Sequence, residues 1–324
     1  MSISRREFIG TAAAAGMAAG APAGTGNTPL PARVLGRTGA QVSILAFGAG
    51  SRFLSYTEED QAVAALTRAL DLGITYIDTS DDYGSEHLSE RRVGIAIKGR
   101  RDKLFLATKL TSRDGNQSQR IVEKSLKALQ VDRLDLLHIH SLTTAEDLAK
   151  IEAKGGPLDQ ILKLREQKVT RFIGITSHAD PAVLQTALER HDFDCTQLAL
   201  NAGTVSMMGG QHGMVPDPGV RSSFETLALP VAIRKKMGVL AIKAFAQEAL
   251  IGQAPVEKLL YYTLSLPVTA AVVGMPKLEH IDHNARLASA FKPLPAGEMR
   301  RISGMLSEKN KQALDRFFLH HVDG

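Results

Sequence analysis

Short apolar runs alternate with amphipathic, helix-like segments along most of this chain. The apolar runs have the length of β-strands and lie at 42–47, 74–79, 104–109, 134–140, 171–176, 195–200, 238–243 and 268–273. The helix-like segments follow them at 57–72, 85–97, 117–129, 157–167, 181–190, 222–237, 255–264 and 278–290. This alternation indicates a parallel sheet, and eight strand–helix units in 324 residues predict α/β architecture as a single closed (β/α)8 TIM barrel.

An open, doubly wound sheet is the alternative fold. Such a sheet carries a G-x-G-x-x-G turn after an early strand, and no such turn follows the first strands here.

Two segments lie outside the repeat. We interpret the long stretch 202–223 as a flap on the substrate side, with a disordered insertion as the alternative. Residues 297–321 predict a C-terminal extra helix, packed outside the barrel or over its mouth.

The first 25 residues have a composition of their own. Arg5 and Arg6 precede Glu-Phe-Ile, small and weakly apolar residues cover 11–20, and Ala-Pro-Ala follows at 21–23. These are the parts of a secretory signal, and the arginine pair resembles the signal read by the twin-arginine export machinery. A disordered Ala/Gly tail is the alternative. We therefore expect a signal peptide over 1–25, export to the periplasm, and a barrel domain over 30–324.

Composition excludes several classes of protein. A hydrophobic content of 44% and a charged content of 23% are globular values. The formal charge of +5 comes from scattered basic residues, so nucleic-acid binding is not expected. The run at 11–20 is too short for a membrane span, so we do not expect an integral membrane protein. Cys195 is the single cysteine, and His280 and His283 lack a ligand partner, so we expect no metal site.

Two residues near the end of the second predicted barrel strand have side chains suited to proton chemistry. Asp78 lies where the strand 74–79 ends, and Tyr83 follows five residues later. Catalytic groups of such barrels lie at the carboxyl ends of the strands. A turn rich in Asp and Ser is the alternative interpretation of this stretch.

Two neighbouring strand ends add a lysine and a histidine, Lys109 and His140. Burying Lys109 is costly unless it meets a carboxylate, and Asp78 is the obvious partner. A phenol has a pKa of ~10, and a neighbouring ammonium should lower it, which would make Tyr83 a usable acid. His140 could then hydrogen-bond a substrate oxygen. His138 shares the strand face of His140 but lies deeper, so we expect a packed core histidine.

These residues together resemble the aldo-keto reductase family. Asp78-x4-Tyr83-Gly84, Lys109 after Ala-Thr, and His140 match the four catalytic positions of that family in order. The opening Leu-Gly-Arg-Thr-Gly at 35–39 resembles the N-terminal β-hairpin of the family. The resemblance extends from about residue 33 to about residue 284.

The resemblance implies NAD(P)H-dependent reduction of aldehydes or ketones, or oxidation of the matching alcohols, by hydride transfer. Tyr83 would be the general acid or base, and His140 and Tyr83 would bind the substrate oxygen. Position 178 is commonly Asn in the family and is His here. The cofactor-binding residues implied by the resemblance lie late in the chain: Ser177, His178 and Gln197 at the nicotinamide amide, Phe245 as the stacking aromatic, and Gly274, Met275, Lys277, His280 and Asn284 near the adenosine.

The phosphate preference of the cofactor stays open between NADP(H) and NAD(H). Only Lys277 and His280 are candidate partners for a 2′-phosphate. Export adds the hypothesis that the protein loads its cofactor before export and retains it, with a second substrate to reset it. A nicotinamide-nucleotide-binding barrel for sensing or partner docking is the alternative function. A metal-dependent sugar isomerase is disfavoured because no carboxylate/histidine ligand set is present.

Overall fold

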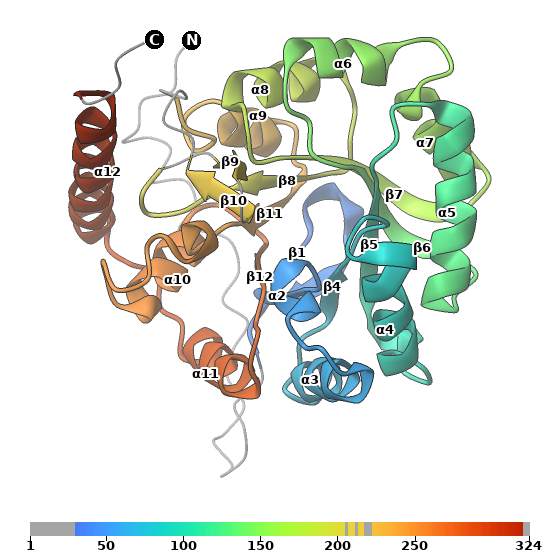
Figure 1. Ribbon diagram of the computed structural model, residues 1–324, viewed down its shortest axis with the longest axis horizontal. Coiled ribbons are helices and arrows are strands. Elements are labelled where there is room, and N and C mark those ends of the chain that lie inside the picture. Colours follow the sequence, from blue (N-terminus) through green and yellow to red (C-terminus); the bar gives the residue numbers. More distant parts are fainter. Residues whose placement is uncertain (1–29, 205–206, 211–212, 217–221, 320–324) are drawn as a thin grey trace.

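Eight parallel strands close into a barrel in the order β11-β12-β3-β4-β5-β6-β7-β8, and helices surround it (Figure 1). The computed structural model describes residues 30–204, 207–210, 213–216 and 222–319. The predicted (β/α)8 barrel is therefore confirmed, and the open sheet is excluded. The barrel strands are β3 (Leu45–Gly48), β4 (Tyr76–Asp78), β5 (Phe105–Leu110), β6 (Leu134–Ile139), β7 (Thr170–Ser177), β8 (Cys195–Ala199), β11 (Gly238–Ile242) and β12 (Ala270–Val273).

Several of the helices begin at a capping side chain or at a proline. The Asp114 carboxylate accepts from the backbone N–H of Gln117, and Asp180 does the same for the helix that begins with Pro181. The helices around the barrel are α3 (Glu59–Asp71), α4 (Leu88–Ala96), α5 (Gly115–Leu129), α6 (Ala145–Glu152), α7 (Pro157–Glu166), α8 (Pro181–Arg190), α9 (Ala228–Arg234), α10 (Val256–Ser265) and α11 (Leu278–Ser289). The sequence analysis missed α6 and started α9 six residues early.

An N-terminal hairpin closes the amino end of the barrel, as expected. It pairs β1 (Ala32–Val34) with β2 (Gln41–Ser43), with the short 3-10 helix η2 (Gly36–Thr38) at its turn. Leu35 is fully buried among the apolar side chains that fill the lower barrel. Gly36 has φ +49 and lies so close to the backbone of Met237 and Gly238 that a Cβ would be 2.3 Å away. Only glycine fits this contact without moving the backbone.

The segment after β8 contains a second hairpin, β9 (Met207–Gly210) with β10 (Gly213–Pro216). Strand β10 approaches the 3-10 helix η5 (Ala246–Glu248), which follows β11, so the hairpin lies beside the carboxyl-end rim of the barrel. The rest of the predicted flap includes residues outside the described ranges. The described part of the chain contains no helix long and apolar enough to cross a membrane.

The predicted final helix is α12 (Ala296–Leu319), at the left of Figure 1. Its Leu306 is fully buried, and the Ser307 hydroxyl lies 2.9 Å from the Thr204 hydroxyl just after β8. The helix therefore packs on the outside of the barrel and also contacts the loop that follows β8.

Candidate active site

A buried lysine forms the centre of the site at the carboxyl ends of β4 and β5. The Lys109 ammonium donates to Asp78 Oδ2 at 2.7 Å, to the Thr79 carbonyl at 2.8 Å and to the Tyr83 hydroxyl at 3.1 Å. An ammonium has three hydrogens, so these partners satisfy it completely. Lys109 is 1% exposed and Asp78 3% exposed, so the charge pair is removed from water. The structure thus brings together the three residues that the sequence analysis grouped.

The loop after β4 holds Tyr83 over the lysine. The backbone N–H of Thr79 donates to Ala107 at 3.0 Å, which continues the β4–β5 ladder past the strand end. Gly84 then turns the chain with φ +81. A Cβ on Gly50 would lie 3.3 Å from the Tyr83 ring, so this glycine gives the ring its packing space.

The proton affinities correct one expectation. Burial raises the pKa of Tyr83 above its ordinary value, and this effect exceeds the opposing influence of the Lys109 ammonium. The predicted net lowering of the Tyr83 pKa was therefore wrong, because Asp78 cancels part of the lysine's field and burial disfavours a phenolate. For Lys109, burial disfavours the charge, but Asp78 and Tyr83 together outweigh it and raise the pKa.

His140, just after β6, completes the group of four. Its ring meets the Tyr83 ring edge-on, with centroids 5.7 Å apart and planes at 79°. Its Nδ1 lies 3.2 Å from the Ser80 hydroxyl and 3.3 Å from Asp82 Oδ1. Burial lowers the pKa of His140, while Asp82 acts to raise it. The sequence analysis missed Asp82, although its position directly before Tyr83 was the available signal.

His138 is a buried core histidine, as predicted. Its ring is 0% exposed, and within the described residues neither ring nitrogen has a hydrogen-bond partner. A Cβ on Gly174 would be 2.4 Å from His138 Nδ1, so the absence of a side chain on β7 makes room for the ring. Burial, with Lys109 and His140 nearby, lowers the pKa of His138 well below its ordinary value, so the ring is neutral.

The predicted nicotinamide residues lie at the end of β7 and within the neighbouring strand β8. The Ser177 hydroxyl donates to the Leu142 carbonyl at 2.7 Å, and His178 Nε2 lies 3.2 Å from the Ser141 hydroxyl. Gln197 is 1% exposed, and its amide nitrogen has no hydrogen-bond partner among the described residues. A buried amide N–H in that state is costly, which marks Gln197 as a group able to bind a ligand.

The predicted adenosine residues lie around the end of β12 and along α11. Gly274 lies against Arg52, because a Cβ there would be 2.8 Å from the arginine Cβ. Met275 is fully buried and Asn284 5% exposed. Lys277 and His280 are exposed at the start of α11.

Two residues after β11 bear on the same rim. Phe245, the predicted stacking aromatic, is half-buried and packs against the main hydrophobic core. Lys243, which the sequence analysis did not assign, has φ +60 and donates to Gln247 Oε1 at 3.0 Å. Burial, together with repulsion from Lys109 and Arg52, lowers the pKa of Lys243 to about 8. Within the described chain it forms no ion pair, which suits it to an incoming anion.

Two contacts connect the loops after β3 and β11 beside Lys243. The Gln247 amide donates to the Ser51 hydroxyl at 3.1 Å, and Arg52 Nε lies 3.3 Å from Glu248. Since β12 lies between these two strands, the contacts join loops on either side of its end. Among described residues, no group of His, Cys, Asp or Glu is arranged to hold a metal ion.

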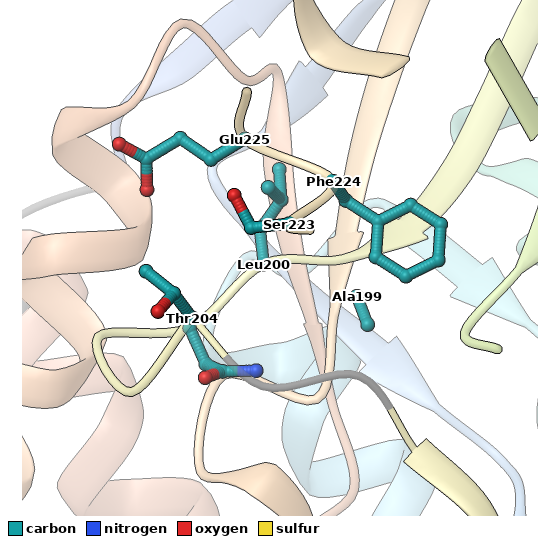
Figure 2. A pocket seen from close by; sticks show the side chains of 7 residues that line it. Ala199, Leu200, Thr204, Ser223, Phe224 and Glu225 are labelled. Atoms are coloured by element: carbon teal, nitrogen blue, oxygen red, sulfur yellow. The ribbon is translucent and has the colours of Figure 1, made fainter. Parts of the chain in front are cut away.

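A small pocket near the end of β8 contains none of these residues. Figure 2 shows Thr204, Ser223, Phe224 and Glu225 among the residues that line it. The Glu225 carboxylate accepts from the Tyr262 hydroxyl at 2.7 Å, which ties it to α10. We do not assign this pocket to the active site.

The fold and site define a class of protein: a TIM-barrel enzyme with a phenol between an ammonium and an imidazole at its mouth. The model of the aldo/keto reductase family matches residues 45–216. The chain therefore belongs to the aldo/keto reductase family.

Relatives of known sequence are similar to parts of this chain. L-galactose dehydrogenase from Arabidopsis thaliana is 36% identical over 169 residues, which is 46% of this chain and 49% of the relative. The chain thus spans about half the length of that enzyme. The uncharacterized oxidoreductase YqkF from Bacillus subtilis is 26% identical over 272 residues, 72% of this chain and 84% of the relative.

Solved structures share the fold at lower identity. An aldo-keto reductase from Bacillus halodurans in its holo form has TM-score 0.68 and 22% identity, covering 85% of this chain and 96% of that one. An aldo-keto reductase from Klebsiella pneumoniae in complex with NADPH has TM-score 0.68 and 22% identity, covering 85% and 94%.

Proposed function

We propose that this protein is an NAD(P)H-dependent oxidoreductase that reduces aldehydes or ketones, or oxidises the matching alcohols. The observation that carries the proposal is the Tyr83 hydroxyl, held 3.1 Å from the Lys109 ammonium at the barrel mouth. The family of the chain supports the reaction class, and the NADPH bound to the Klebsiella reductase supports the cofactor class.

The residues divide the proton chemistry among them. A bound nicotinamide would supply the hydride for the carbonyl carbon. Tyr83 gives its hydroxyl proton to the carbonyl oxygen, and the Lys109 ammonium stabilises the phenolate that remains. Because the pKa of Tyr83 is raised, the phenol is protonated at neutral pH and ready to act as the acid. Asp78 holds Lys109 in place at 2.7 Å.

The residues present fit a nicotinamide dinucleotide. The unpartnered amide of Gln197, with Ser177 and His178 at the next strand end, would hold the nicotinamide carboxamide. Lys243 would meet the negative charge of the phosphates, because it is a half-buried cation at the rim. Lys277 and His280 stay the candidates for a 2′-phosphate, and NADP(H) and NAD(H) are both to be tested.

Export remains part of the proposal. The segment that resembles a twin-arginine signal, residues 1–25, lies outside the described residues. We propose a periplasmic enzyme that folds and binds its cofactor before export through the twin-arginine machinery. A periplasmic sample that carries no dinucleotide, measured by mass, would contradict retention of the cofactor.

The test is the Tyr83→Phe variant with a panel of small aldehydes and ketones. Loss of the general acid should lower kcat about 10²–10⁴-fold, while dinucleotide binding, followed by fluorescence, is retained. Tyr261→Phe is the matched control, since its hydroxyl donates to the Leu287 carbonyl at 2.9 Å, away from the site. Full turnover in Tyr83→Phe would contradict the mechanism. Dinucleotide binding without turnover in the unaltered protein would instead indicate a binding module.

A further inference from the structure

His140 has a carboxylate neighbour that comes from the residue directly before Tyr83. Asp82 Oδ1 lies 3.3 Å from His140 Nδ1 and accepts a hydrogen bond from the Ser80 hydroxyl at 2.6 Å. The same hydroxyl oxygen lies 3.2 Å from His140 Nδ1. One ring nitrogen therefore faces two oxygen atoms at once.

These contacts determine where the ring carries its proton. An ionised carboxylate only accepts hydrogen bonds, and the Ser80 hydroxyl has already given its hydrogen to Asp82. Both oxygens facing Nδ1 are therefore acceptors, and His140 meets them only with a proton on Nδ1. In the neutral ring, Nε2 is then the bare acceptor nitrogen.

We propose that Asp82 is a positioning residue that holds the proton of His140 on Nδ1 and strengthens the ring's hold on a second proton. The proposal rests on the proposed function for its meaning, because His140 is the group that would meet the substrate oxygen. The neutral ring can accept the hydroxyl hydrogen of an alcohol through Nε2. The doubly protonated ring can donate to a carbonyl oxygen, with its charge balanced by Asp82.

The exposure of the two partners supports this division of roles. The Asp82 side chain is 47% exposed, so water keeps the carboxylate ionised, whereas the His140 side chain is 10% exposed. Partial burial opposes ionisation of Asp82, but the hydrogen bond from His140 and the Ser80 hydroxyl prevail and lower the pKa of Asp82 to about 2. The carboxylate is therefore charged throughout the working range of an enzyme.

Other groups around His140 act on the same proton equilibrium. Lys109 disfavours the charged ring, and Asp78 favours it. The Arg113 guanidinium donates to the His140 backbone carbonyl at 2.8 Å and is itself paired with Asp147 at 2.7 Å. The titratable and charged groups that surround the ring are Asp78, Asp82, Tyr83, Lys109, Arg113 and His138.

The proposal is tested by ¹⁵N NMR of the histidine rings in the full chain, with His140→Gln used to assign the His140 signals. Above the titration of the ring, unaltered protein should show the proton on Nδ1 and a bare Nε2. A ring with its proton on Nε2 in the unaltered protein overturns the proposal. Neither substrate nor cofactor is present, so this result stands apart from the success or failure of the proposed function.

The Asp82→Asn variant tests the charge. Removing an opposite charge at this distance should weaken proton binding by the ring about tenfold, a downward shift of about one unit in its titration. In carbonyl reduction, which uses the doubly protonated ring, the fall of kcat/KM on the alkaline side should move to lower pH with it. An unchanged His140 titration in folded Asp82→Asn overturns the proposal.

Asp81→Asn is the matched control, because it removes the neighbouring carboxylate. The Asp81 carboxylate accepts from the Thr111 hydroxyl at 2.8 Å instead of facing His140. The His140 titration should stay in place in this variant. An equal shift in Asp81→Asn and Asp82→Asn would overturn the proposal, since the effect would then be the general charge of the loop.

Discussion

The barrel interior has two layers of side chains, both supplied by the same strands. The lower layer, toward the amino ends of the strands, is apolar, and the upper layer, toward their carboxyl ends, is charged. In the lower layer, Tyr76, Phe105 and Phe172 stack, with ring centroids 5.4 and 6.2 Å apart. Two residues beyond Tyr76 lies Asp78, paired with buried Lys109. Because strand side chains alternate, a two-residue step stays on the same face of the sheet and only changes height.

The difference between these layers shows how the barrel divides stability from chemistry. Aromatic and aliphatic packing in the lower layer is favourable in its own right. A buried ion pair gains little net stability, because desolvation offsets the attraction between its members. Packing in the lower layer therefore holds the strands that carry the charged upper layer. The residues of the upper layer then serve proton transfer and do not have to stabilise the fold.

The sharpest way to break this comparison is to remove one charge from the upper layer. Lys109→Met leaves the Asp78 carboxylate buried without a counter-charge, so the free energy of unfolding should fall by about 3–5 kcal/mol. Urea denaturation measures it. The double variant Asp78→Asn/Lys109→Met should recover part of the loss. If the single variant is as stable as the unaltered protein, the layers do not differ as argued.

A smaller loss is expected from the lower layer. Leu35→Ala removes a fully buried side chain from the apolar cluster and should cost about 2–5 kcal/mol in urea denaturation. Activity per folded molecule should stay unchanged, since the residue lies at the other end of the barrel. Val34→Ala, at a side chain 49% exposed, is the control and should change stability by less than about 0.5 kcal/mol. A loss of kcat in Leu35→Ala would contradict this separation, because activity would then depend on packing in the lower layer.

The smallest effect concerns pH. The folded pKa of His138 lies well below its ordinary value, so the unfolded chain takes up a proton that the folded chain refuses. Its stabilising contribution is complete above pH ~6.5 and declines as pH falls, by at most about 1.4 kcal/mol per unit. His138→Gln should reduce the slope of stability against pH between about 6 and 5 by that amount. Equal slopes in urea titrations of both proteins would contradict a neutral buried ring.

The sequence predicted the barrel well because the strands are short, mostly apolar runs that alternate with amphipathic segments. The four strand-end residues could be predicted for the same reason: polar side chains appear abruptly where those runs stop. Burial could not be judged in this way, and the raised pKa of Tyr83 was missed for that reason. Asp82 and Lys243 were missed because their positions depend on loop backbone, such as φ +60 at Lys243, which no periodicity reveals.

Cys195, at the start of β8, is the single cysteine of the chain and is fully enclosed in the barrel. Burial raises the pKa of its thiol, and the side chain is 0% exposed, so the thiol is protonated and shielded from solvent in the folded protein. A thiol reagent can modify Cys195 only after the strands of the barrel separate. The rate at which the Cys195 sulfur reacts therefore reports the rate at which the barrel opens, and no cysteine has to be introduced for the measurement.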